Sequence, residues 1–207
     1  IGCHSYQHEL SFRFDRRSFK HDVEKSKKLI EDIIGEQIDS FRAPGFSFTE
    51  KNTWALEVLS ELGFKYDCSI FPAKHDYGGF KNYGISEPAI LNLANGAQIK
   101  EFPVNFRKIF GTNLVFSGGG FFRLLPYWLV KRWAINSDYV MTYFHPRDFD
   151  PDQPVIKSLP FHRKFKSYVG LSTSFVKFQN VRSDFQFLTI KEADSLNDWK
   201  AKRTIDI

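Results

Sequence analysis

The spacing of apolar and polar positions predicts helices and strands that alternate along the first half of the chain. Apolar residues recur every three or four positions over residues 18–34 and 50–62, and a glycine suited to a helix C-terminus follows each run. Short apolar runs over residues 39–41, 64–71 and 99–106 predict strands. Because strands alternate with helices, we expect parallel β-α-β units.

The second half of the chain continues this pattern after an irregular stretch. Residues 73–97 are polar and rich in glycine, which predicts a long loop. We expect helices over residues 122–135 and 167–184, a strongly apolar strand over 139–144 and a last strand over 185–190.

Polar side chains repeatedly follow the predicted strands. Residues 1–3 are expected to end a strand, and His4 comes next; Arg42 follows residues 39–41, and Asp67 lies in or at the end of its strand. His145 follows residues 139–144. In α/β barrels the site lies at the carboxyl ends of the strands, so we expect these four side chains to share one pocket.

His4 and His8 are candidate metal ligands. On a helical turn, side chains four residues apart point the same way, so both rings can bind one ion such as zinc. The alternative is a chance spacing, since six histidines in a chain of this length produce some such pairs. A third ligand is normally required.

Arg42, Asp67 and His145 are candidates for catalysis, each with a plainer alternative. Arg42 suits the orientation of a carboxylate, but it also fits a surface position before a loop. Asp67 suits the tuning of a neighbouring histidine or arginine, or the capping of a strand end. His145 suits proton donation, or a core position with one hydrogen bond.

Composition narrows the class of protein. The 207 residues suffice for one domain, which we place over residues 1–207. The net charge is +5, and the basic residues are scattered among acidic ones, which excludes a nucleic-acid-binding face. No apolar run is long enough to span a membrane. Most of the 23 phenylalanines are expected in the core, and a carbohydrate groove is the alternative use. Cys3 and Cys68 are expected to be reduced, which weakly favours a cytoplasmic location.

Together these residues resemble the motifs of the polysaccharide deacetylases of the NodB-homology type, carbohydrate esterase family 4. The matching motifs are the histidine pair His4 and His8, Arg42-Ala43-Pro44, Asp67 and His145. Three longer segments are similar to the subgroup found in bacterial exopolysaccharide loci, at residues 66–72, 118–127 and 145–154.

The resemblance implies a distorted (β/α)7-type barrel and removal of N-acetyl groups from an N-acetylhexosamine-containing polysaccharide. It implies a divalent metal, usually zinc, held by His4 and His8, and His145 as the general acid. It further implies that Arg42 holds the base aspartate and that Asp67 tunes the histidine.

One family motif has no counterpart in this chain. The family places two aspartates, the base and the third metal ligand, upstream of the histidine pair, whereas only three residues precede His4. We therefore expect a domain truncated at its N-terminus, without its first strand and helix, that binds metal weakly and has little or no activity. An unpaired sheet edge would then favour a homodimer that covers the missing strand.

Two other functions remain open. The chain could be a non-catalytic carbohydrate-binding remnant, or an amidohydrolase of the same fold that acts on a small molecule. The residues do not identify the sugar or its linkage.

Overall fold

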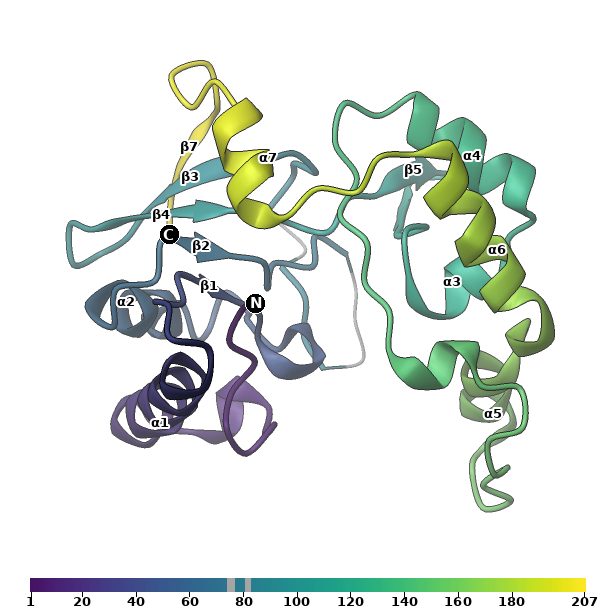
Figure 1. Cartoon of the computed structure of the whole chain (residues 1–207), viewed down its shortest axis with the longest axis horizontal. Coiled ribbons are helices and arrows are strands. Elements are labelled where there is room, and N and C mark those ends of the chain that lie inside the picture. The colour runs from purple at the N-terminus through teal and green to yellow at the C-terminus, as the bar shows by residue number, and fades with distance from the viewer. Residues whose placement is uncertain (74–76, 81–82) are drawn as a thin grey trace. The chain divides into compact units, whose positions relative to one another are not determined.

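The computed structural model describes residues 1–73, 77–80 and 83–207, and the parts of the predicted loop at 74–76 and 81–82 lie outside these ranges. The chain divides into two compact units (Figure 1). Unit 1 comprises residues 1–104 and 189–207, and unit 2 comprises residues 105–188. None of the described helices has the length and apolar character needed to cross a bilayer.

Unit 1 is built on a mixed sheet of five strands. Their spatial order is β1 (Ser40–Phe41), β2 (Tyr66–Asp67), β4 (Gln98–Glu101), β3 (Ala89–Asn92) and β7 (Thr204–Asp206). Strands β1, β2 and β4 are parallel, β3 is antiparallel to β4, and β7 is parallel to β3. Cys3 adds one parallel bridge to Phe41, which places the following residue, His4, beside the end of β1.

Helices cover both faces of this sheet. Helices α1 (Arg16–Ile34) and α2 (Trp54–Glu61) lie against the face that carries Phe41, whose ring packs on Phe19 of α1. Helix α7 (Ile190–Leu196) lies on the other face, where Asp194 accepts a hydrogen bond from Tyr66. Two 3₁₀ turns, η1 (Ser11–Arg13) and η2 (Pro44–Phe46), complete the unit.

Unit 2 packs helices around a small aromatic core. Its elements are β5 (Arg107–Ile109), β6 (Thr112–Leu114), α3 (Gly119–Leu124), α4 (Tyr127–Ile135), η3 (Pro146–Phe149), α5 (Phe161–Tyr168) and α6 (Leu171–Asp184). Phe116, Phe122, Val130 and Val181 form the buried centre. Gly118 pairs with Tyr143, whose carbonyl oxygen would lie 2.1 Å from any Cβ at position 118, so only glycine allows this approach.

The predicted helices were largely confirmed, with different limits. Asp15 caps α1, which therefore begins two residues before the predicted start, and Gly35 ends it in the left-handed region. Helix α2 begins at Trp54 because Thr49 donates to Asn52 in a turn that competes with the helix.

In unit 2 the helix predicted over residues 122–135 is two helices. Pro126 cannot donate a backbone hydrogen bond and holds Leu125 in an extended conformation, which separates α3 from α4. The helix predicted over residues 167–184 is α6, and α5 precedes it as a separate helix.

Several strand predictions were wrong or too long. Of residues 139–144 only Tyr143 forms a bridge, because the apolar side chains pack on helices; the Phe144 ring lies 5.3 Å from that of Phe178. Residues 185–190 form no strand, since Thr189 caps α7 instead. The predicted loop over residues 73–97 contains β3.

The chain therefore has a mixed α/β fold. Its described strands form an open five-stranded sheet and a two-stranded hairpin. The expected (β/α)7 barrel, the N-terminal truncation and the single domain over residues 1–207 stay predictions.

Candidate functional site

The loop that carries both candidate metal ligands is organised by one buried carboxylate of α1. Asp22 accepts hydrogen bonds from the Ser5 hydroxyl at 2.7 Å and from the backbone N–H groups of Tyr6 and Gln7, both at 2.9 Å. On the same helix Ser26 donates to the Ser5 carbonyl at 3.2 Å. These contacts hold the backbone of residues 5–7 against a rigid helix.

His4 and His8 lie in a loop and not on a helical turn. Residues 4–9 have no helical structure, and Ser5 and His8 both adopt positive φ, at 68° and 54°. The loop nevertheless brings the two imidazole rings together, with centroids 5.0 Å apart and planes at 71°. The pairing that the spacing suggested is therefore present, but a bent loop produces it.

The backbone of Arg42 fixes the orientation of the His4 ring. Nδ1 of His4 lies 2.6 Å from the Arg42 carbonyl oxygen, which can only accept, so this nitrogen carries the proton. A hydrogen bond of this kind is typical behind metal-binding histidines, where it leaves Nε2 as the metal-binding atom. His4 is half-buried and His8 is exposed.

The Arg42 and Asp67 segments are joined by polar contacts at the ends of β1 and β2. Nε of Arg42 donates to the Cys68 carbonyl at 3.1 Å. The Ser69 hydroxyl accepts from Ala43 N–H at 2.8 Å and donates to Asp67 at 2.5 Å. Asp67 is therefore coupled through Ser69 to the residue that follows Arg42.

Asp67 and Glu101 form a buried pair of carboxyl groups on neighbouring strands. They are register partners of β2 and β4, and neither is accessible to solvent. Burial raises the pKa of Asp67, and burial together with the charge of Asp67 raises the pKa of Glu101 well above its usual range. Glu101 therefore keeps its proton and can donate it to Asp67.

His145 lies in unit 2 at the start of η3. Its side chain is 61% exposed, and Nδ1 lies 3.5 Å from the buried Asp148 carboxylate. The same oxygen accepts the backbone N–H of His145 at 2.9 Å. His145 was expected to follow a strand over residues 139–144, but that run is not a strand. Its contacts with the 3₁₀ turn η3 hold it instead.

The structure thus brings His4, His8 and Arg42 together in unit 1, with Asp67 joined through Ser69. His145 belongs to the other unit, so the predicted pocket of four residues remains a prediction. Within the described ranges, no group of three or more His, Cys, Asp or Glu side chains gathers as a metal site. His4 and His8 fit a zinc ion as two nitrogen ligands and need further ligands to complete it.

Sequence reasoning missed Asp22, Ser69 and Asp148. Asp22 carried a detectable signal, because it lies between Phe19, Val23 and Ser26 on the buried face of α1, where an unpaired carboxylate is costly. Ser69 and Asp148 follow their partners by two and three residues, one after a two-residue strand and one in a single 3₁₀ turn, and such short elements show no periodicity in the sequence.

Comparisons with known proteins agree with these motifs. A family described as Polysaccharide deacetylase matches residues 1–66, and the Domain of unknown function (DUF3473) matches residues 68–195, more than half of the chain. No curated protein matches the sequence.

Two solved structures resemble the chain. A 4-alpha-glucanotransferase from Thermococcus litoralis is 12% identical over 100% of this chain, with a TM-score of 0.60, and a likeness at this identity shows the fold alone. A putative polysaccharide deacetylase from Mycobacterium smegmatis is 17% identical over 98% of this chain, with a TM-score of 0.47. The chain spans 29% and 59% of the lengths of these two proteins. From its two family matches, the chain belongs to the polysaccharide deacetylase family, in the group that carries DUF3473.

Proposed function

We propose that this chain is part of a metal-dependent N-deacetylase that hydrolyses acetamide groups on an N-acetylhexosamine-containing polysaccharide, such as a bacterial exopolysaccharide. The observation that carries this proposal is the close approach of the His4 and His8 rings, with His4 held through Nδ1 by the Arg42 carbonyl. Membership of the deacetylase family supports the same reaction class.

Each residue then has a distinct task. His4 and His8 would hold the metal, which when bound supplies a Lewis acid for the acetamide carbonyl. Arg42 and Asp67 are assigned the roles of carboxylate holder and tuning residue by the family resemblance. His145 is exposed and is the group proposed to protonate the departing amine.

Calorimetric titration of the metal-free chain with zinc tests the carrying observation. We expect binding that is lost in the double variant His4→Ala/His8→Ala. The matched control is His21→Ala/His162→Ala, since both of these histidines are exposed and neither belongs to the loop at residues 4–8. Binding that survives loss of His4 and His8 would contradict the proposal.

Acetate release from an acetylated hexosamine oligosaccharide, assayed with zinc, tests the reaction itself. The expectation that the chain alone binds metal weakly and turns over slowly stays a prediction, which this assay and the titration check. Release by the parent chain that is lost in His145→Gln would support the role of His145.

We also propose that both units belong to one deacetylase domain. The DUF3473 match begins in unit 1, crosses all of unit 2 and returns to unit 1. The first family match ends at Tyr66, inside strand β2, so the sheet of unit 1 includes residues from both matches.

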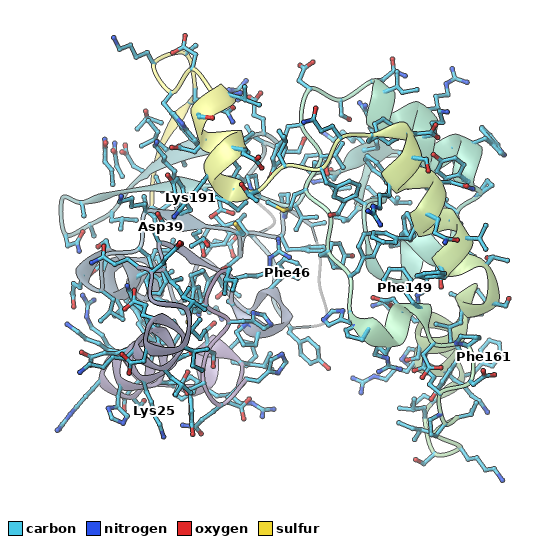
Figure 2. The ribbon with its side chains drawn as sticks, viewed as in Figure 1. Lys25, Asp39, Phe46, Phe149, Phe161 and Lys191 are labelled. Carbon is cyan, nitrogen blue, oxygen red and sulfur yellow. The ribbon has the colours of Figure 1, made fainter. Side chains whose placement is uncertain are left out.

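A non-catalytic carbohydrate-binding function is the second candidate. It is favoured by exposed aromatic side chains of unit 2, among them Trp128 at 64% and Phe161 at 84% exposure. Phe161 is labelled in Figure 2. Such rings can stack on sugar faces. Binding of the acetylated polymer without acetate release, unaffected by His4→Ala/His8→Ala, would favour this function over catalysis.

A further inference from the structure

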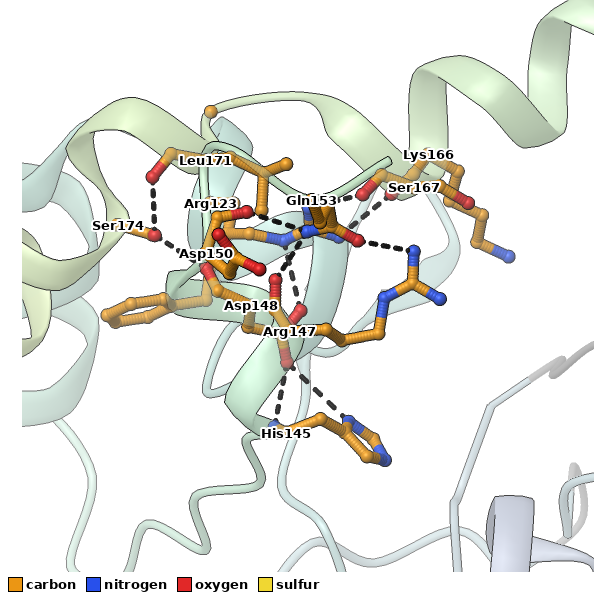
Figure 3. Close-up of polar contacts among 12 residues, drawn as sticks. Arg123, His145, Arg147, Asp148, Asp150, Gln153, Lys166, Ser167, Leu171 and Ser174 are labelled. Carbon is orange, nitrogen blue, oxygen red and sulfur yellow. Dashed lines mark hydrogen bonds and ion pairs between the residues drawn. The ribbon is translucent and has the colours of Figure 1, made fainter. Parts of the chain in front are cut away.

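A buried arginine of unit 2 supports the carboxylate that contacts His145 (Figure 3). Arg123 of α3 donates to the backbone carbonyls of Ser167 at 2.8 Å and Lys166 at 2.9 Å. Its Nε lies 3.2 Å from Asp148, and the two side chains are only 6% and 8% exposed. Backbone carbonyl groups therefore fix the guanidinium of Arg123 in the position from which it contacts Asp148.

The surroundings of Asp148 keep it ionised. Burial alone would raise the pKa of this carboxyl group. Hydrogen bonds from His145 and the positive charge of Arg123 outweigh burial, so the pKa of Asp148 is lowered. A buried carboxylate that is paired and hydrogen-bonded in this way remains charged at neutral pH. Arg147 and Tyr143 are the other titratable groups that act on Arg123.

Asp148 contacts His145 at both its backbone and its ring. One oxygen of Asp148 accepts the His145 N–H at 2.9 Å and lies 3.5 Å from Nδ1, and Asp148 N–H donates to the His145 carbonyl at 2.8 Å. The two backbone contacts thus fix the main chain of His145, and the Asp148 carboxylate faces Nδ1 of the imidazole ring rather than Nε2.

We propose that Asp148, held by Arg123, is the positioning residue of His145: it keeps the proton of the neutral ring on Nδ1 and leaves Nε2 to serve the substrate. This inference rests on the proposed deacetylase function. In that reaction, water adds to the acetamide carbon and loses a proton to a base. The C–N bond breaks, and Nε2 of the imidazolium gives its proton to the amine nitrogen, so that the ring is left neutral with its proton on Nδ1.

The proposal differs from the expectation that Asp67 tunes the histidine. Asp67 lies in unit 1 and receives hydrogen bonds from both the hydroxyl and the backbone of Ser69. Asp148 lies three residues after His145 and contacts it directly. Substitutions of the two aspartates therefore separate the two assignments.

The ring tautomer of His145 is the readout that a merely structural role would not change. Nitrogen NMR of the parent chain, at mildly alkaline pH and with His145→Gln to assign the signal, is expected to show the proton on Nδ1. In Asp148→Asn the tautomer with the proton on Nε2 should gain population, whereas the exposed Asp150→Asn should match the parent. A proton on Nε2 in the parent chain would overturn the inference without any variant.

Kinetics provide the second arm. We expect Asp148→Asn to lower kcat for acetate release about 10-fold or more with KM unchanged, and to cost nothing further in a His145→Gln background. A further loss in that background, or an unchanged tautomer in a folded Asp148→Asn chain, would overturn the inference. If the tautomer responds as expected, but zinc binding does not depend on His4 and His8 and the parent releases no acetate, the proposed function fails and the pairing of Asp148 with His145 stands.

Discussion

Asp22 shows how one side chain can define a loop that has no regular structure. Its two carboxylate oxygens accept three hydrogen bonds from residues 5–7, which replace the backbone pairing that a helix or strand would provide. Two residues of this loop adopt positive φ, which non-glycine residues do only at a cost in free energy. The hydrogen bonds to Asp22 offset that cost.

We predict that Asp22→Asn weakens zinc binding about 10- to 100-fold. The amide has one oxygen, so it cannot accept all the hydrogen bonds from residues 5–7 that hold the loop with His4 and His8. Calorimetry against the parent chain measures the effect. Asp32→Asn, an exposed change on the same helix, is the control and should bind zinc as the parent does. Equal affinity in Asp22→Asn and the parent would show that the loop does not depend on this carboxylate.

The carboxyl pair of Asp67 and Glu101 makes stability depend on pH in an unusual direction. Burial and the charge of Asp67 raise the pKa of Glu101 in the folded chain well above the value of about 4.5 that it has when unfolded. Above about pH 4.5 the folded chain therefore binds more protons than the unfolded chain. Protonated Glu101 therefore contributes to the stability of the folded chain fully below about pH 4.5. This contribution is lost as the pH rises towards the pKa of Glu101 in the folded chain.

We predict that Glu101→Gln removes much of this loss, since a neutral amide has no proton to release. The parent should lose up to about 1.4 kcal/mol of unfolding free energy per pH unit from this group, and the variant should lose less. Urea unfolding between about pH 5 and 8 measures both, with the exposed Glu36→Gln as the control. A variant whose pH dependence equals that of the parent would refute this account.

At the level of single residues, sequence motifs predicted the candidate site residues but not the contacts that hold them. The spacing of His4 and His8 predicted a pair of ligands, and the two rings do approach each other. The geometry came from Asp22, fourteen residues after His8, and a tertiary contact of that kind leaves no periodic pattern in the sequence.

Helix α3 depends on a charged side chain from another helix. Nζ of the buried Lys177 on α6 donates to the carbonyls of Phe122, Arg123 and Leu125 at 2.9, 2.8 and 2.6 Å. These carbonyls lie at the C-terminal end of α3, where a positive charge is favourable. Lys177 thereby anchors the short helix that carries Arg123.

We predict that Lys177→Met destabilises the chain by about 2–4 kcal/mol, because it leaves buried carbonyl groups without a donor. Chemical denaturation followed by tryptophan fluorescence measures the change, since Trp128 and Trp133 both lie on α4 of the same unit. Arg182→Ala, an exposed cation on α6, should change stability by less than about 0.5 kcal/mol. Similar values for the two variants would contradict the anchoring role.

At the level of elements, local signals predicted helices better than strands. The pattern of α1 and its terminal Gly35 were evident because a helix is defined by neighbours three and four residues apart. The apolar run over residues 139–144 gave the same signal as a buried strand, yet its pairing with Gly118 is limited to Tyr143. Sheet pairing depends on distant partners, which periodicity does not reveal.

Each unit of the molecule has its own core. The larger apolar cluster, which includes Phe19, Phe41 and Leu59, lies in unit 1, and the cluster around Phe122 lies in unit 2. Cys3 and Cys68 are both free, buried and in unit 1, while unit 2 contains no cysteine. Thiol chemistry therefore reports on unit 1 alone.

We predict that both thiols react slowly with an alkylating reagent until unit 1 opens. Burial raises the pKa of Cys68 to about 12 and also raises that of Cys3, so little thiolate is present at neutral pH. Labelling followed by mass spectrometry over a urea series should rise with the unfolding of unit 1. Rapid labelling of both cysteines in the native chain would contradict the buried positions.

The division of unit 1 into two stretches of sequence affects how the protein is synthesised. Strand β3 pairs with β7, and the whole of unit 2 lies between these two strands in the sequence. The 84 residues of unit 2, from 105 to 188, must therefore be translated before β7 can join the sheet. At about 5–20 residues per second, the ribosome leaves that edge of the sheet uncovered for several seconds. During this interval β3 and β4 can pair as a hairpin, while their outer edge depends on a segment that has not yet emerged.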